Sequence, residues 1–103
     1  MSDVNSRYVL ANVNVLVLDD NRHMRQLVES ILHALGVNHV CQAADAAQAF
    51  KELQHINADV IIVDWHMKLL NGLDFVRLVR TAKDSPKPYV PIIMLSGIRN
   101  MAG

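Results

Sequence analysis

The chain has 103 residues, of which 51% are hydrophobic, and this is enough for one small domain with its own core. Its ten basic and ten acidic residues cancel, which argues against a nucleic-acid-binding surface because such a surface needs clustered positive charge. No apolar run approaches the roughly 20 residues of a membrane span, and residues 1–6 lack the composition of a signal peptide. The single cysteine, Cys41, cannot form an internal disulfide, so we expect a cytoplasmic protein.

Residues 1–12 are polar and mixed, which predicts an N-terminal extension to a domain over residues 13–103. The apolar residues 13–18 predict a buried strand, and Asp19-Asp20-Asn21 then supply good caps for a helix. Apolar residues follow at helical spacing: Met24, Leu27, Val28, Ile31, Leu32 and Leu35. Gly36 comes next and is typical of a helix C-terminus.

The middle of the chain predicts a strand, a helix and a second strand. Residues 39–43 form a short β-prone run, and Asp45 can cap the helix after it. The apolar positions of that helix are Ala46, Ala49, Phe50 and Leu53. Residues 58–63 are again apolar and lead directly into Asp64, which predicts a strand buried on both faces with a carboxylate at its end.

The last third of the chain continues the alternation. Gly72 opens a predicted helix that runs through residue 79. Residues 83–88 hold two prolines and several charges, which suit neither helix nor sheet. Residues 91–95 predict a fourth strand, ended by Ser96-Gly97.

Strands that alternate with helices predict an α/β fold, a doubly wound parallel sheet with helices on both faces. The carboxyl ends of parallel strands share one edge of the sheet, and ligands bind there. The first, third and fourth strands end at Asp19-Asp20, Asp64 and Ser96, so we expect these side chains to converge.

Three converging carboxylates repel one another, and a hard divalent cation removes that repulsion. All-oxygen ligands with some water favour Mg²⁺. Asp64 would then be free to attack phosphorus as a nucleophile, and Ser96 to donate a hydrogen bond to a phosphoryl oxygen. Each feature alone has a simpler explanation as a helix cap or a turn residue, so the prediction rests on their combination.

The sequence resembles the receiver domain of bacterial two-component response regulators, the CheY-like family, from about residue 13 to residue 97. Three segments carry the resemblance: residues 15–20, the Asp64…Met67…Gly72 segment, and residues 92–97. The resemblance implies a flavodoxin-like fold. Because the family's fifth strand and helix would lie beyond Gly103, it implies strand order 2-1-3-4 here.

The resemblance also implies roles for individual residues. Asp64 would be the phosphoacceptor, Asp20 a direct Mg²⁺ ligand, and Asp19 a ligand mainly through water. The backbone carbonyl of His66 would be the third protein ligand, and the Ser96 hydroxyl would turn toward the phosphoryl group. The family receives its phosphoryl group from a sensor histidine kinase or a phosphotransfer protein, and promotes its own phosphorylation and hydrolysis. It is a switch rather than an enzyme.

The chain departs from the family pattern in three ways. Lys68 stands where proline is usual, and His66 stands where Asn is frequent, so its side chain either contacts the phosphoryl group or is half exposed in a loop. The family's Lys at the end of the fifth strand has no counterpart before Gly103. We therefore expect residues 91–95 to form an exposed apolar edge that favours a homo-oligomer, unless the chain is a fragment of a longer regulator.

Other functions fit the sequence less well or remain open. A truncated or degenerate receiver that only binds partners, without phosphorylation, remains open because the Lys is absent. An aspartate-nucleophile phosphohydrolase needs an acid two residues after its nucleophile, and neither Asp19 nor Asp64 has one. A flavin-binding domain lacks support, since no phosphate-cradling loop follows the first strand. His23, His33, His39 and His55 lack metal-ligand spacing as a set, which predicts surface positions.

Overall fold

The computed structural model of the chain describes residues 10–65, 67 and 72–95. Within these residues, four parallel strands form one sheet in the order β2-β1-β3-β4. The strands are β1 (Asn14–Leu18), β2 (His39–Ala43), β3 (Val60–Asp64) and β4 (Ile92–Leu95). The helices are α2 (Arg22–Ala34), α3 (Ala46–Leu53) and α4 (Gly72–Thr81). The predicted flavodoxin-like fold and strand order 2-1-3-4 are confirmed.

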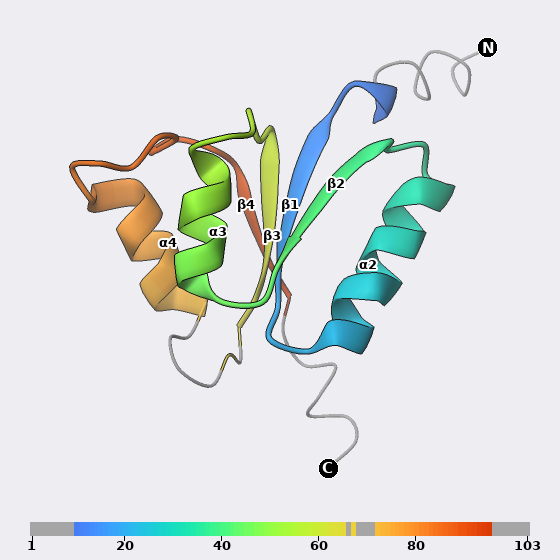
Figure 1. Ribbon diagram of the computed structural model, residues 1–103, viewed down its shortest axis with the longest axis horizontal. Coiled ribbons are helices and arrows are strands. Elements are labelled where there is room, and N and C mark those ends of the chain that lie inside the picture. The colour runs from blue at the N-terminus through green and yellow to red at the C-terminus, as the bar shows by residue number, and fades with distance from the viewer. Residues whose placement is uncertain (1–9, 66, 68–71, 96–103) are drawn as a thin grey trace.

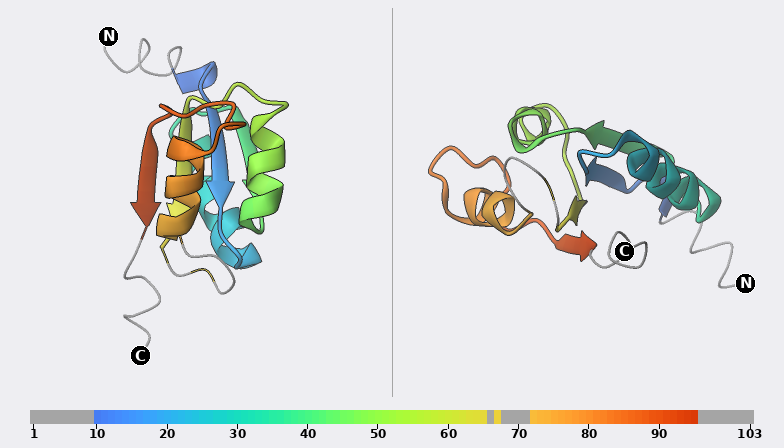
Figure 2. Two further views of the ribbon diagram at one scale, coloured as in Figure 1. Left: turned by 90° about the vertical axis from the view of Figure 1, so that its left-hand side faces the viewer. Right: turned by 90° about the horizontal axis from the view of Figure 1, so that it is seen from below.

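Helices cover both faces of the sheet, with α2 on one face and α3 and α4 on the other (Figure 1). The view along the sheet in Figure 2 shows the same two-sided arrangement. Successive side chains of β1 point to opposite faces of the sheet, because side chains alternate along a strand. Leu16 and Leu18 pack in the core under α3 and α4, whereas Val15 and Val17 pack in the core under α2. Both central strands are therefore apolar over four successive residues, 15–18 in β1 and 60–63 in β3.

The two cores differ in size. The core under α3 and α4 holds most of the fully buried side chains, including Phe75 and Val79 of α4. Among the described residues, the core under α2 has four buried side chains, with partly buried ones such as Val28 and Leu32 around them. Leu10, which lies in the predicted N-terminal extension, also packs against this smaller core.

Helix α2 begins and ends where the sequence predicts. Asn21 is its N-cap, and the Asn21 Oδ1 accepts a hydrogen bond from the Met24 amide at 3.2 Å. After the helix, Gly36 adopts a φ of 106°, a conformation that glycine reaches without a steric penalty. None of the helices in the described residues is long and apolar enough to cross a membrane.

Helix α2 is less buried than its apolar pattern predicts, since Leu27, Ile31 and Leu35 are each more than half exposed. The contacts of the helix explain why. Arg25 and Glu29 both reach Gln42, so the flank that they share faces β2. Leu27 and Ile31 lie on the opposite flank, toward the side of β3 and β4, which α2 does not cover.

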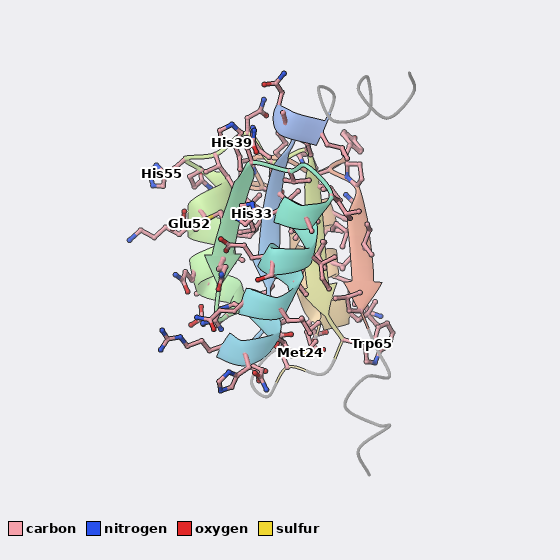
Figure 3. The ribbon with its side chains drawn as sticks, turned by 90° about the vertical axis from the view of Figure 1, so that its right-hand side faces the viewer. Met24, His33, His39, Glu52, His55 and Trp65 are labelled. Carbon is pink, nitrogen blue, oxygen red and sulfur yellow. The ribbon has the colours of Figure 1, made fainter. Side chains whose placement is uncertain are left out.

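Helix α2 does not cover strand β4, which lies at the far edge of the sheet beyond β3 (Figure 3). The strand pairs with β3, and Ile62 is aligned with Ile93 in that pairing. Ile62 is buried, whereas 51% of Ile93 is exposed. The described part of the chain therefore exposes apolar side chains on one flank of α2 and on the outer strand β4.

Candidate functional site

Three aspartates meet at the carboxyl end of the sheet, as the sequence predicts. Asp19 and Asp20 follow β1 directly, and Asp64 is the last residue of β3. Leu18 is paired with Val63 in the parallel ladder, so the two strands deliver their aspartates side by side. One carboxylate oxygen of each of the three residues lies within 4.8 Å of the others.

The site is largely withdrawn from solvent. Asp19 is 4% exposed and Asp64 is 7% exposed, whereas Asp20 is half-buried. Moving a carboxylate out of water is unfavourable unless hydrogen bonds or a cation compensate. Three such groups at this distance therefore favour a site that takes up positive charge.

The backbone around Asp19 is firmly held. Its amide donates to the carbonyl oxygen of Ala43 on β2 at 3.1 Å. The Asp19 Oδ1 accepts a hydrogen bond from the Asn21 amide at 2.8 Å, so the first aspartate is tied to the residue that caps α2. The turn between β1 and α2 thus connects the acidic site to the start of the helix.

The backbone next to Asp64 is also fixed from two directions. The Trp65 amide donates to the Leu95 carbonyl of β4 at 2.8 Å, and the Trp65 carbonyl accepts from the Gly72 amide at 3.3 Å. The Trp65 side chain is 40% exposed and lies at the same end of the molecule as Met24, in the first turn of α2 (Figure 3). Trp65 is therefore well placed to report on events at the neighbouring aspartate.

The donor set fits Mg²⁺. Two ligand oxygens on opposite sides of this ion, each at about 2.1 Å, would lie about 4.2 Å apart. The three carboxylate oxygens, within 4.8 Å of one another, are close to that spacing and are all hard donors. Asp19, Asp20 and Asp64 can thus hold the ion with a small inward movement or with water completing the shell.

Two predicted participants lie outside the described residues. These are His66, whose carbonyl is the predicted third ligand, and Ser96, the predicted phosphoryl contact. Lys68, the departure in the loop, also lies outside them. Their roles stay predictions.

One residue that contacts the site escaped the sequence analysis. Arg25, one turn into α2, donates through Nη1 to the carbonyl oxygen of Asp19 at 2.8 Å and through Nε to Gln42 Oε1 at 3.0 Å. The signal in the sequence is the four-residue spacing of Arg25, Glu29 and His33, which places three polar residues on one flank of the helix.

The chain matches a known protein family along most of its length. The model of the response regulator receiver domain matches residues 15–102. The chain belongs to this family. The resemblance carried by residues 15–20, 64–72 and 92–97 is thereby confirmed, and the receiver fold brings the aspartates of the first two segments together.

Named relatives of this receiver domain include chemotaxis proteins. CheY1 of Helicobacter pylori is 40% identical over 86 residues, and the match covers 82% of this chain and 67% of CheY1. CheY-3 of Vibrio cholerae is 29% identical over 85 residues, covering 82% of this chain and 64% of CheY-3. The chain thus spans about two thirds of the length of these relatives.

Solved receiver structures superpose on the chain. CheY4 of Vibrio cholerae has a TM-score of 0.72 at 32% identity, and the match covers 87% of this chain and 75% of CheY4. A receiver protein from Pseudomonas putida has the same TM-score at 26% identity, covering 87% of this chain and 74% of the other. The arrangement of strands and helices around the acidic site is thus shared with receiver domains of known structure.

Proposed function

We propose that this receiver domain accepts a phosphoryl group on Asp64, in a reaction that requires Mg²⁺, and that it does so in the cytoplasm. The observation that carries the proposal is the convergence of Asp19, Asp20 and Asp64 within 4.8 Å at the end of two paired strands. The family match supports a phosphohistidine on a sensor kinase or a phosphotransfer protein as the donor. The phosphorylated domain would then change its contacts with other proteins.

The transfer forms one bond and breaks another. A carboxylate oxygen of Asp64 attacks phosphorus, the new O–P bond forms, and the P–N bond of the phosphohistidine breaks. The electron pair of that bond returns to the imidazole nitrogen, which takes up a proton. Water later attacks the phosphorus of the acyl phosphate, the O–P bond to Asp64 breaks, and inorganic phosphate leaves as the Asp64 carboxylate is restored. We propose that the domain promotes both steps without a separate enzyme.

The residues around Asp64 have separate tasks in this proposal. Asp19 and Asp20 would hold Mg²⁺ together with Asp64 and the carbonyl of His66, and the bound ion would supply positive charge near the phosphoryl oxygens. Ser96 would donate its hydroxyl hydrogen to one of those oxygens. Burial of Asp19 and Asp64 would limit the access of water to the acyl phosphate.

Labelling with acetyl phosphate tests the proposal. Incubation with acetyl phosphate and Mg²⁺, followed by intact mass measurement, should show the addition of one phosphoryl group. Asp64→Asn should abolish the labelling, and so should chelation of Mg²⁺. The matched control is Asp59→Asn, which alters an exposed acid directly before the other end of β3 and keeps an acceptor for the Asn14 amide. The control protein should label like the wild type.

A receiver that binds partners without phosphorylation is the second candidate function. It is favoured if the chain takes no label under conditions that label a longer receiver domain. Labelling that survives in Asp64→Asn would instead show that another residue accepts the group, and would overturn the role given to Asp64.

We further propose that the domain self-associates, with a second copy covering the apolar surface of α2 and β4. Leu27, Ile31 and Ile93 are each about half exposed on this surface, at 52%, 51% and 51%. Strand β4 is paired only with β3 among the described strands, so its outer edge offers backbone groups to another strand. In a two-fold dimer, the apolar surface of one copy would face the same surface of the other copy, and the β4 edge of one would face the β4 edge of the other.

Analytical ultracentrifugation at low micromolar concentration tests this association. We expect a species larger than the monomer, and we expect Ile93→Lys to shift it toward the monomer. The control is Leu78→Lys, because Leu78 is 44% exposed but belongs to α4 on the opposite face. A stable monomer of the wild-type chain would contradict the proposal.

A further inference from the structure

A line of hydrogen bonds runs from the acidic site along one flank of α2. The Arg25 guanidinium donates to the Asp19 carbonyl and to Gln42 Oε1. Gln42 Nε2 in turn donates to Glu29 Oε1 at 2.6 Å, and the other Glu29 oxygen lies 3.1 Å from Nε2 of His33. The line ends where His33 Nδ1 meets the Val37 carbonyl at 2.8 Å.

The chemistry of its members fixes the direction of these bonds. A guanidinium can only donate, and a carboxylate can only accept. Gln42 lies between the two, so its carbonyl oxygen must face Arg25 and its amide nitrogen must face Glu29. The side chain of Arg25 is therefore held in its orientation by Gln42 of β2, and Gln42 is held in turn by Glu29 of α2.

The bond from Arg25 to Asp19 acts on the peptide that joins the two metal-site aspartates. The Asp19 amide is already held by Ala43, and the Arg25 bond holds the carbonyl on the other side of the same residue. The orientation of that carbonyl sets the direction in which Asp20 leaves the strand. Without Arg25 the peptide could rotate, and the Asp20 carboxylate would move relative to Asp64.

We propose that Arg25 is a positioning residue for the metal site of this receiver domain, and that it acts through the Asp19–Asp20 peptide rather than through its charge. This inference rests on the proposed Mg²⁺-dependent function. The two ways in which Arg25 could act predict opposite results. A positive charge beside the site opposes the binding of a cation, so its removal alone would strengthen Mg²⁺ binding. Loss of positioning would weaken it.

The test is the dissociation constant of Mg²⁺, measured by titration with Trp65 fluorescence as the signal. Arg25→Met should raise that constant about tenfold, the low end of the effect expected for groups that orient metal ligands. Arg25→Lys should restore part of the affinity, because an ammonium group can reach one acceptor but not both. Gln42→Met should weaken binding severalfold although the charge of Arg25 remains.

Arg22→Met is the matched control, because it removes an equal charge from the same turn of α2 at an exposed position. Its Mg²⁺ affinity should equal or slightly exceed that of the wild type. Unfolding by urea without Mg²⁺ separates an effect on the site from an effect on the fold. If Arg25→Met does not fold, Arg25→Lys and Gln42→Met decide the question by the same measurement.

Two results would overturn the positioning role. One is unchanged or tighter Mg²⁺ binding in Arg25→Met, and the other is wild-type binding in both Arg25→Lys and Gln42→Met. A wild-type protein that shows no response up to tens of millimolar Mg²⁺, either in Trp65 fluorescence or by calorimetry, would instead count against the proposed function. The two failures are thus distinguishable.

Discussion

A Cβ atom on Gly72 would lie 2.6 Å from the carbonyl oxygen of Asp64, which is closer than a Cβ carbon can approach a backbone oxygen. Gly72 is the first residue of α4, and Asp64 is the last residue of β3. The absence of a side chain at Gly72 thus lets the helix start against the strand that carries the predicted phosphoacceptor. The close contact links the position of α4 to the geometry of the site.

Gly72→Ala should therefore damage both the fold and the site. The Met94 methyl group, also 2.6 Å from the added carbon, can move, but the Asp64 carbonyl belongs to the sheet and cannot move without shifting the strand end. We expect a loss of about 1–3 kcal/mol in the free energy of unfolding, as for other overpacked positions. We also expect severalfold weaker Mg²⁺ binding, measured by titration.

Gly36→Ala is the control for Gly72→Ala. Gly36 has a φ of 106°, so alanine there should cost about 1–2 kcal/mol of stability through backbone strain. Gly36 follows the C-terminal end of α2, whereas the acidic site adjoins the other end of that helix. Its Mg²⁺ affinity should stay at the wild-type value. Equal Mg²⁺ affinity in both variants would show that Gly72 has only a structural role.

Mg²⁺ should stabilise the folded chain, and Asp64→Asn should remove most of that effect. A ligand that binds only the folded state at ten times its dissociation constant adds about 1.4 kcal/mol to the free energy of unfolding. Without Mg²⁺, Asp64→Asn should be more stable than the wild type by about 1 kcal/mol, because one of three crowded negative charges is gone.

Urea unfolding with and without Mg²⁺ measures both effects, and Asp59→Asn again serves as the control. Asp59 accepts a hydrogen bond from the Asn14 amide at the amino end of the sheet. Its substitution should leave the stabilisation by Mg²⁺ unchanged. Full stabilisation by Mg²⁺ in Asp64→Asn would mean that the ion binds elsewhere.

The positions of Asp19, Asp20 and Asp64 were predictable from the sequence, because they follow short apolar runs rich in Val and Ile, which are typical of buried strands. A parallel sheet aligns such strand ends, so convergence followed from topology without knowledge of side-chain contacts. The cap residues Asn21 and Asp45 were predictable for a similar reason. Their side chains bond to backbone amides three residues further on, which is a local interaction.

The contact between Arg25 and Asp19 was not predictable in the same way. It depends on how far α2 is rotated about its axis, and the six apolar positions of the helix left that rotation open. The polar contacts of Arg25 and Glu29 with Gln42 draw one flank toward β2. Leu27 and Ile31, expected in the core, are consequently exposed on the other flank.

The ion pair of His33 with Glu29 should make stability depend on pH. The hydrogen bond to the Val37 carbonyl, followed by the bond to Glu29, raises the pKa of His33 above its ordinary value of 6.5. The hydrogen bonds from Gln42 and then from His33 lower the pKa of Glu29 below its ordinary value of 4.5. His33 therefore stabilises the fold fully below about pH 6.5 and loses this effect as pH rises through its folded-state pKa.

The pH dependence of the stability that Glu29 contributes runs in the opposite direction. Its contribution is present above about pH 4.5 and is lost as pH falls through the lower folded-state pKa. The pair should thus contribute most to the stability of the fold between about pH 4.5 and about pH 6.5. Urea unfolding of the wild type and His33→Gln should show a larger difference at about pH 5.5 than at about pH 8.5. In a Glu29→Gln background this pH dependence should shrink, and a difference that is equal at both pH values would contradict the assignment.

Cys41 should react slowly with thiol reagents. Burial, and next the hydrogen bond to Glu52, raise the pKa of its thiol from 9.0 to about 11. The Cys41 Sγ lies 3.4 Å from Glu52 Oε2, which therefore opposes formation of a thiolate. A rise of two pKa units lowers the thiolate fraction at about pH 8 roughly a hundredfold, and only the thiolate is nucleophilic.

Alkylation of Cys41 by iodoacetamide, followed by mass measurement, should be correspondingly slower than for an unfolded peptide with the same sequence. Glu52→Gln should raise the rate severalfold, whereas Glu29→Gln, the more distant acid, should raise it less. A wild-type rate equal to that of the peptide would show that the thiol is open to solvent and unperturbed.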